Sequence, residues 1–180
     1  LACERGAVAT GLDASSRLAA IAAARSPQAT IKTGDMFALP FDDASFDVAT
    51  SFRGIWGNGL EALREAHRVV RPGGKVGLSF WGNQRRMEAY PLFAVLGQTT
   101  QAERDNTGAM VNIGRPDVAE QLMTAAGLLP GTRTSLRLHW EFPDIELAVR
   151  ALASTGPAYL AMQHVGEEAF RASVRQAAAG

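Results

Sequence analysis

Residues 34–49, which read Gly-Asp-Met-Phe-Ala-Leu-Pro-Phe-Asp-Asp-Ala-Ser-Phe-Asp-Val-Ala, constrain the fold more than any other stretch. An alternating apolar run from Ala29 to Thr33 ends in Gly34-Asp35, a loop containing a proline follows, and a second apolar run begins at Phe46. An acidic residue thus follows a predicted strand, at the position where open α/β sheets bind ligands. The stretch therefore predicts a ligand-binding edge of a parallel sheet.

Strand and helix patterns alternate along the rest of the chain. Strands are predicted at residues 7–12, 29–33, 46–52 and 75–81, and helices at 17–25, 60–70, 87–98, 116–126, 145–153 and 167–178. A further half-exposed strand is predicted at 136–140. This alternation predicts an α/β fold with a mainly parallel sheet and helices on both faces.

Composition narrows the class of protein. At 180 residues and 47% hydrophobic content, the chain fits one domain with a real core. Eighteen basic residues balance eighteen acidic ones, so the net charge gives no reason to expect binding to nucleic acid. The lone Cys3 is compatible with a reducing cytosol, and no apolar run approaches the roughly 20 residues that span a bilayer. We expect a soluble cytoplasmic protein.

Asp13 and Asp35 each follow a predicted strand and so form the candidate binding pair. A carboxylate at the position of Asp13 can accept hydrogen bonds from both hydroxyls of a ribose. Asp13 could equally be a helix N-cap or a solvated loop acid, because Asp is favoured there. Asp35 could accept from an exocyclic amine while the backbone N–H of Met36 donates to a ring nitrogen. Together the two acids predict a gap shaped for adenosine.

These residues belong to an ordered series of motifs. The series comprises Thr10-Gly11-Leu12-Asp13-Ala14-Ser15, Gly34-Asp35-Met36, Leu39-Pro40-Phe41, Ser45-Phe46-Asp47-Val48 and the run from Leu63-Arg64-Glu65 to Pro72-Gly73-Gly74. Over about the first 80 residues it resembles the small-molecule branch of the class I S-adenosylmethionine-dependent methyltransferases, which have a Rossmann-like fold.

The resemblance implies a cofactor, S-adenosyl-L-methionine, with S-adenosyl-L-homocysteine as product. It implies that Asp13 holds the ribose, that Ala14 lies beside the adenine, and that Asp35 and Met36 recognise the adenine edge. The positions of Ser51 and Phe52 imply contact with the methionine part of the cofactor.

The resemblance also implies segments outside this sequence. Residues 1–7 read as the end of a helix closed by Gly6, so we expect the family's first strand and Gly-rich loop upstream of Leu1. In the family that strand lies between the strands ending at Asp13 and Ser51, so its loss is predicted to split the sheet. One more strand is expected after Gly180.

The leading hypothesis is methyl transfer from S-adenosylmethionine to an O, N or C nucleophile of a small molecule, by alignment and desolvation. No catalytic residue is assigned. The expected acceptor pocket includes Arg53, Trp56 and Trp81. We expect a single domain over residues 1–180, with a cofactor portion at 1–82, a variable substrate or lid region at 83–131, and a C-terminal strand and helices at 132–180. Neither a nucleic-acid partner nor a membrane is expected, and the oligomeric state stays open.

Two alternatives remain. A methyltransferase-like protein could bind or scaffold without turnover, and a nicotinamide-dependent oxidoreductase could use Asp13 for its ribose, although the Gly-Asp-Met and Leu-Pro-Phe series argues against that. His67 is interpreted as a packing or surface residue, and His139 and His164 are isolated candidates for a general base. No spacing of histidines or cysteines predicts a metal site.

Overall fold

The computed structural model describes residues 1–55, 59–83, 87–98 and 112–178. They form two compact units. The first unit contains residues 1–55, 59–78 and 123–129, and the described part of the second contains residues 79–83, 87–98, 112–122 and 130–178. The described strands lie in the first unit except for Ser79, and the second unit is mostly helical.

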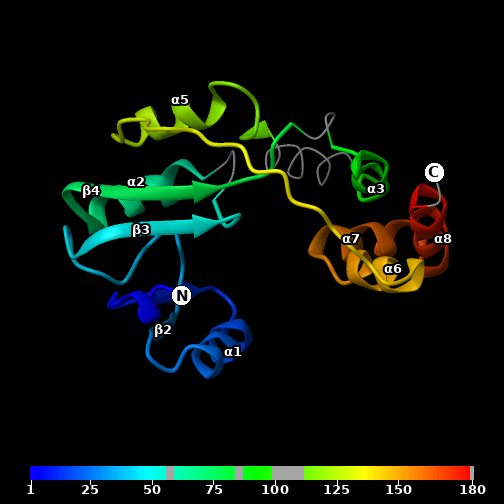
Figure 1. The fold of residues 1–180 in the computed structure, drawn as a ribbon, viewed down its shortest axis with the longest axis horizontal. Helices are drawn as coiled ribbons and strands as arrows, with labels where there is room; N and C mark the ends of the chain where they lie inside the picture. Colours follow the sequence, from blue (N-terminus) through cyan, green and yellow to red (C-terminus); the bar gives the residue numbers. More distant parts are fainter. Residues whose placement is uncertain (56–58, 84–86, 99–111, 179–180) are drawn as a thin grey trace. The chain divides into compact units, whose positions relative to one another are not determined.

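The chain begins with a short 3-10 helix, η1 (Cys3–Arg5), which ends at Gly6 in the left-handed conformation (φ 85°). Strand β1 (Thr10–Asp13), helix α1 (Ser16–Arg25) and strand β2 (Thr30–Thr33) follow as one β-α-β unit (Figure 1). β1 and β2 pair in parallel, with Thr10 opposite Thr30 and Asp13 opposite Thr33.

The rest of the first unit is built around a second pair of strands. Strand β3 (Phe46–Phe52) and strand β4 (Val70–Ser79) are hydrogen-bonded neighbours, and Figure 1 draws them pointing the same way. Helix α2 (Leu60–Val69) connects them, as a parallel pair requires. Its apolar stripe is buried and consists of Ala62, Leu63, Ala66 and Val69.

The predicted α/β class with parallel strands is confirmed, but the described strands form two separate two-stranded sheets, β1-β2 and β3-β4, and not one continuous sheet. A split between the strands that end at Asp13 and near Ser51 is what the sequence analysis predicts. Val48 on β3 is 54% exposed, so its face of the β3-β4 sheet is only partly covered.

The second unit is built from helices. Helices α6 (Ile145–Ala153), α7 (Gly156–Val165) and α8 (Glu167–Ala178) pack on one another, and α3 (Tyr90–Val95) packs on α8. Their core is fully buried at Val149, Ala158, Ala161, Phe170 and Val174. Helix α5 (Val118–Ala125) belongs to both units, because the division falls within it.

Three expectations need correction. α7 was not predicted as a helix, although Thr155 caps it and Pro157 lies in its first turn. The strand predicted at 136–140 does not form, and residues 130–142 contain neither helix nor strand. Leu136 and Leu138 are 81% and 77% exposed, and none of the described strands pairs with this segment. β4 starts at Val70, not at residue 75, so Pro72 and Gly73 lie inside the strand.

Candidate cofactor site

Asp13 and Asp35 come together at one end of the β1-β2 sheet. Asp13 ends β1 opposite Thr33, and the N–H of Gly34 donates to the carbonyl oxygen of Asp13 over 3.0 Å. A side chain at Gly34 would lie 2.9 Å from Cδ1 of Leu12, so glycine permits this close pairing. Both acids therefore stand at the carboxyl ends of adjacent parallel strands, as predicted, and Ala14 follows directly as an exposed residue.

The Asp13 carboxylate is not a helix N-cap. Its Oδ1 accepts from the N–H of Ser15 over 2.8 Å, and the cap of α1 is Ser15, whose Oγ accepts from Leu18 N–H over 3.3 Å. The other carboxylate oxygen of Asp13 has no protein donor among the described residues. One oxygen thus shapes the turn, and the second remains available for a ligand hydroxyl.

Asp35 repeats this arrangement. Its Oδ1 accepts from Phe37 N–H over 2.9 Å, and its carbonyl oxygen accepts from Ala38 N–H over 3.3 Å, which closes a tight turn. Within the described residues, the N–H of Met36 has no acceptor and the second oxygen of Asp35 has no donor. An unpaired donor beside an unpaired acceptor matches the hydrogen-bonding edge of an adenine, so these residues fit the predicted cofactor.

Ser51, Phe52 and Arg53 lie at the carboxyl end of β3, in the other sheet of the first unit. Arg53 adopts a left-handed backbone (φ 59°), which is uncommon for a residue with a side chain. A side chain at Gly54 would lie 2.8 Å from Ser51 Oγ, so the turn is tight. The Phe52 side chain is 77% exposed at this turn.

The other two predicted acceptor residues are Trp56 and Trp81. Trp56 lies outside the described residues. Trp81 belongs to the second unit, where its ring meets Phe93 and Trp140 edge-on, with centroids 5.4 Å and 5.6 Å away. Trp81 is therefore part of an aromatic cluster within its own unit.

The three histidines have separate surroundings. His67 is exposed and its ring lies beside Gly127, where an added Cβ would be 2.9 Å from it, which agrees with a packing or surface residue. His139 lines a cavity of about 460 Å³ in the second unit, together with Trp140, Glu141 and Phe142. His164 is exposed near the end of α7. Among the described residues, none of these histidines has a hydrogen-bond or ion-pair partner for its side chain.

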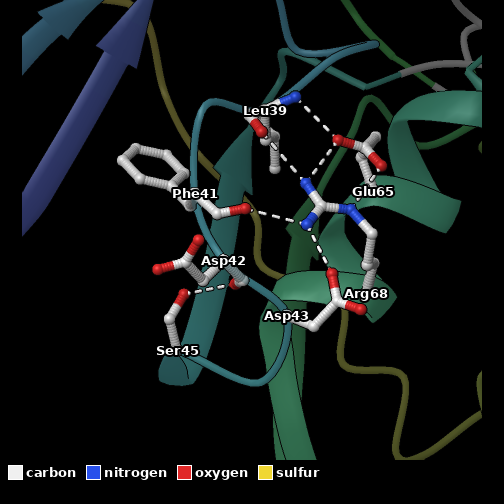
Figure 2. A network of polar contacts seen from close by, with 7 residues as sticks. All are labelled: Leu39, Phe41, Asp42, Asp43, Ser45, Glu65 and Arg68. Carbon is white, nitrogen blue, oxygen red and sulfur yellow. Dashed lines mark hydrogen bonds and ion pairs between the residues drawn. The ribbon is translucent and has the colours of Figure 1, made fainter.

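Sequence reasoning missed a network that links the loop after Asp35 to helix α2 (Figure 2). The Arg68 guanidinium contacts Glu65, Asp43 and the carbonyl oxygens of the loop. Hydrogen bonds from Arg68 hold the pKa of the Glu65 carboxyl below its ordinary value, and those to Glu65 and Asp43 raise the pKa of Arg68. The spacing of Glu65 and Arg68 on one helix face was visible in the sequence, but their loop partners were not.

In the described part of the chain, no three His, Cys, Asp or Glu side chains gather closely enough to hold a metal ion. None of the helices described here is both long and apolar enough to cross a membrane.

Comparison with known proteins supports the family resemblance that the sequence motifs predict. A family model described as a methyltransferase domain matches residues 1–78, which contain β1, β2, β3, all of β4 except Ser79, and both acids. The part of the chain that carries the predicted motif series therefore matches this family. The predicted resemblance to class I S-adenosylmethionine-dependent methyltransferases is thereby confirmed.

Among curated relatives of this methyltransferase domain, malonyl-[acyl-carrier protein] O-methyltransferase of Erwinia pyrifoliae is 35% identical over 129 residues, which are 71% of this chain and 45% of that protein. Ubiquinone/menaquinone biosynthesis C-methyltransferase of Roseobacter denitrificans is 40% identical over 100 residues, which are 50% of this chain and 40% of that protein. The chain thus spans less than half the length of these two relatives.

A solved structure shows the same fold. Geranyl diphosphate methyltransferase, in complex with geranyl diphosphate and sinefungin, aligns with a TM-score of 0.55 over 98% of this chain and 62% of that chain, at 16% identity. At that identity the likeness concerns the fold alone, which is the predicted Rossmann-like arrangement.

Proposed function

We propose that the full-length protein transfers a methyl group from S-adenosylmethionine to an O, N or C nucleophile of a small molecule in the cytoplasm. One observation carries the proposal. Asp13 and Asp35 stand at the ends of paired parallel strands, each with one carboxylate oxygen engaged by its own turn and one left for a ligand. The match of residues 1–78 to the methyltransferase domain family supports it.

In this proposal each polar group has a defined partner on the cofactor. The free oxygen of Asp13 accepts from the ribose hydroxyls, and the free oxygen of Asp35 accepts from the exocyclic amine of adenine. The N–H of Met36 donates to a ring nitrogen. Ala14, which is small and exposed next to Asp13, leaves room for the flat face of the base.

The chain's own contribution to the reaction is alignment. The sulfonium of S-adenosylmethionine supplies a good leaving group, so the protein needs to hold the acceptor in line and exclude water. Ser51 and Phe52 are proposed to contact the methionine part of the cofactor, and Arg53, Trp56 and Trp81 to contact the acceptor. No residue is assigned as a general acid or base.

The proposal distributes these tasks along the sequence. Residues 1–82 hold the cofactor, residues 83–131 shape or cover the acceptor site, and residues 132–180 complete a single domain. Two similar proteins carry names for O-methylation and C-methylation respectively, so the acceptor atom is left open among O, N and C. The lone Cys3 agrees with the reducing conditions of the cytoplasm.

Calorimetric titration tests the proposal directly. S-adenosylmethionine and S-adenosylhomocysteine are titrated into the full-length protein and into the 180-residue chain, with circular dichroism confirming that both are folded. We expect saturable one-to-one binding by the full-length protein. A folded full-length protein that binds neither compound contradicts methyl transfer and favours a non-catalytic binding or scaffolding role.

A further inference from the structure

Two sequence motifs that the cofactor site does not use meet in the structure. Leu39-Pro40-Phe41 lies in the loop after Asp35, and Glu65 and Arg68 lie on helix α2. Figure 2 shows the Arg68 guanidinium lying against this loop, with the Leu39 and Phe41 carbonyl oxygens directed at it. The motifs are therefore the two halves of one set of contacts, here called the Arg68 clamp: Leu39, Phe41, Asp43, Glu65 and Arg68.

The Arg68 guanidinium has five N–H donors, and the clamp provides an acceptor for each. Nε donates to Glu65 Oε1 over 2.7 Å, and Nη2, on the same edge of the guanidinium, donates to Glu65 Oε2 over 2.8 Å. Nη2 also donates to the Leu39 carbonyl over 3.0 Å. Nη1 donates to the Phe41 carbonyl over 2.8 Å and to Asp43 Oδ1 over 2.7 Å.

Glu65 completes the clamp from the other side. Its Oε2 accepts from the N–H of Leu39 over 2.7 Å, so both backbone polar groups of Leu39 are bound by side chains of α2. The Leu39 carbonyl also accepts from Phe41 N–H over 2.8 Å, which closes a three-residue turn around Pro40. Proline suits the central position because its ring fixes φ and it has no N–H to satisfy.

The clamp fixes one flank of the segment that carries Asp35 and Met36. The other flank is fixed by the bond from Gly34 N–H to the Asp13 carbonyl. Beyond Asp43, the N–H of Ala44 donates to the backbone carbonyl of Arg68 over 2.9 Å, so the loop returns to the same helix. Few backbone conformations remain for the residues between these fixed points.

We propose that Arg68 is a positioning residue for the cofactor: its clamp holds the loop so that the Asp35 carboxylate and the Met36 N–H are preorganised for the adenine edge. This inference rests on the proposed function and adds a residue that does not itself touch the cofactor. Preorganisation raises affinity because the loop need not be ordered when the ligand binds.

The clamp requires arginine and not merely a positive charge. The five donors are arranged in a planar fork, and lysine offers three donors on one flexible atom. Arg68→Lys keeps the charge but cannot reach Glu65, Asp43 and two carbonyl oxygens together. Arg64→Lys is the matched control, since Arg64 lies on the same helix and pairs with Glu61 three residues earlier, at the surface and away from the loop.

The test measures S-adenosylhomocysteine affinity of full-length variants by calorimetry, with thermal unfolding followed in parallel. We expect Arg68→Lys to weaken binding by about tenfold, which corresponds to the loss of one or two hydrogen bonds to charged groups. Arg64→Lys is expected to leave affinity within about twofold of the parent.

A double-mutant cycle separates positioning from general stability. If Arg68 acts through Asp35 and Met36, then Arg68→Lys weakens binding by only about threefold in the Asp35→Ala background, less than in the parent, because the Met36 N–H is the one contact left for the clamp to position. Full additivity of the two losses overturns the proposal, as does unchanged affinity of Arg68→Lys accompanied by a lower unfolding temperature. A parent protein that binds no cofactor refutes the proposed function instead.

Milder variants cover the case in which Arg68→Lys fails to fold. Glu65→Gln keeps an acceptor for Leu39 N–H, and Asp43→Asn removes one exposed ion pair. Each is expected to weaken S-adenosylhomocysteine binding by about twofold to fivefold while remaining folded. Unchanged affinity in both folded variants overturns the positioning role.

Discussion

The N–H of Gly34 donates a hydrogen bond of 3.0 Å to the carbonyl oxygen of Asp13. This bond continues the parallel ladder of β1 and β2 by one residue past the last paired position, Asp13 opposite Thr33. As a result, the backbone that carries Asp13 and the backbone that leads into Asp35 cannot move independently. The spacing of the two acids is set by strand register before either side chain meets a ligand.

Asp13→Asn separates the ligand role of Asp13 from its turn role. Asparagine retains an oxygen that can accept from Ser15 N–H. It replaces the free carboxylate oxygen, which accepts hydrogen bonds, with an amide NH₂ group, which donates them. We expect the full-length variant to keep its unfolding temperature and to lose about tenfold in S-adenosylmethionine affinity, measured by calorimetry. Asp47→Asn serves as the control, since Asp47 is exposed and pairs with Arg71 on neighbouring strands. A large drop in stability with intact affinity would mean that Asp13 serves the turn alone.

Gly74→Ala tests the packing of β3 on β4. An added Cβ would lie 2.6 Å from the carbonyl oxygen of Asp47 and 2.9 Å from that of Arg71, and it would also meet Val70. We expect a loss of about 1–3 kcal/mol in the free energy of unfolding, measured with urea. Gly77→Ala on the same strand should be nearly neutral, because the nearest atom, Thr50 Cγ2, is 3.5 Å away. Equal effects of the two substitutions would contradict this account.

The pH dependence of stability should report the Arg68 clamp. Arg68 lowers the pKa of Glu65 from its ordinary value of 4.5 in the folded protein. The pKa of Glu65 is lower in the folded protein than in the unfolded chain. The ionised Glu65 carboxylate therefore stabilises the fold above pH 4.5, and this stabilisation is lost as the pH falls through the folded-state pKa. Urea midpoints measured below pH 4.5 should therefore fall less steeply for Glu65→Gln than for the parent. Arg175 likewise lowers the pKa of Glu146, so this second ion pair also loses its stabilising effect as the pH falls. Glu146→Gln therefore shows how much of the pH dependence of stability comes from the second unit.

Arg53→Gly tests the left-handed turn after β3. Glycine adopts φ near 59° without the cost of about 1–2 kcal/mol that a side chain incurs, although it loses more entropy on folding. We expect unchanged or slightly higher stability, by up to ~1 kcal/mol, together with a higher KM for the acceptor once that acceptor is known. Ala44→Gly is the control, since Ala44 has φ 53° in a loop with no proposed acceptor contact. A KM that rises equally in both variants would remove Arg53 from the acceptor site.

Local patterns in the sequence predicted much of this fold. The bounds of β3, α6 and α8 agree with prediction, because their apolar spacing and caps are local signals. The pair Asp13 and Asp35 was also predictable, since each acid lies at or just after the end of an apolar strand pattern. The strand at 136–140 failed because alternation indicates a half-buried strand only where a neighbouring strand accepts its hydrogen bonds.

The Arg68 clamp shows what local patterns leave out. Glu65 and Arg68 read as an ordinary i, i+3 pair on a helix surface. Their bonds to Leu39 and Phe41 span 26 to 29 residues of sequence. No periodicity encodes such contacts, and they become visible only when the loop and the helix are placed in space.

Residues 123–129 belong to the first unit, although they directly follow residues 79–122 of the second unit in the sequence. Gly127, with φ 85°, packs against the His67 ring, and Ala126 is 4% exposed. A fragment ending near residue 82 would therefore lack part of the unit that carries Asp13 and Asp35. Residues 79–122 are inserted between two pieces of one folding unit, so expression fragments intended to isolate the cofactor portion need to extend through residue 129.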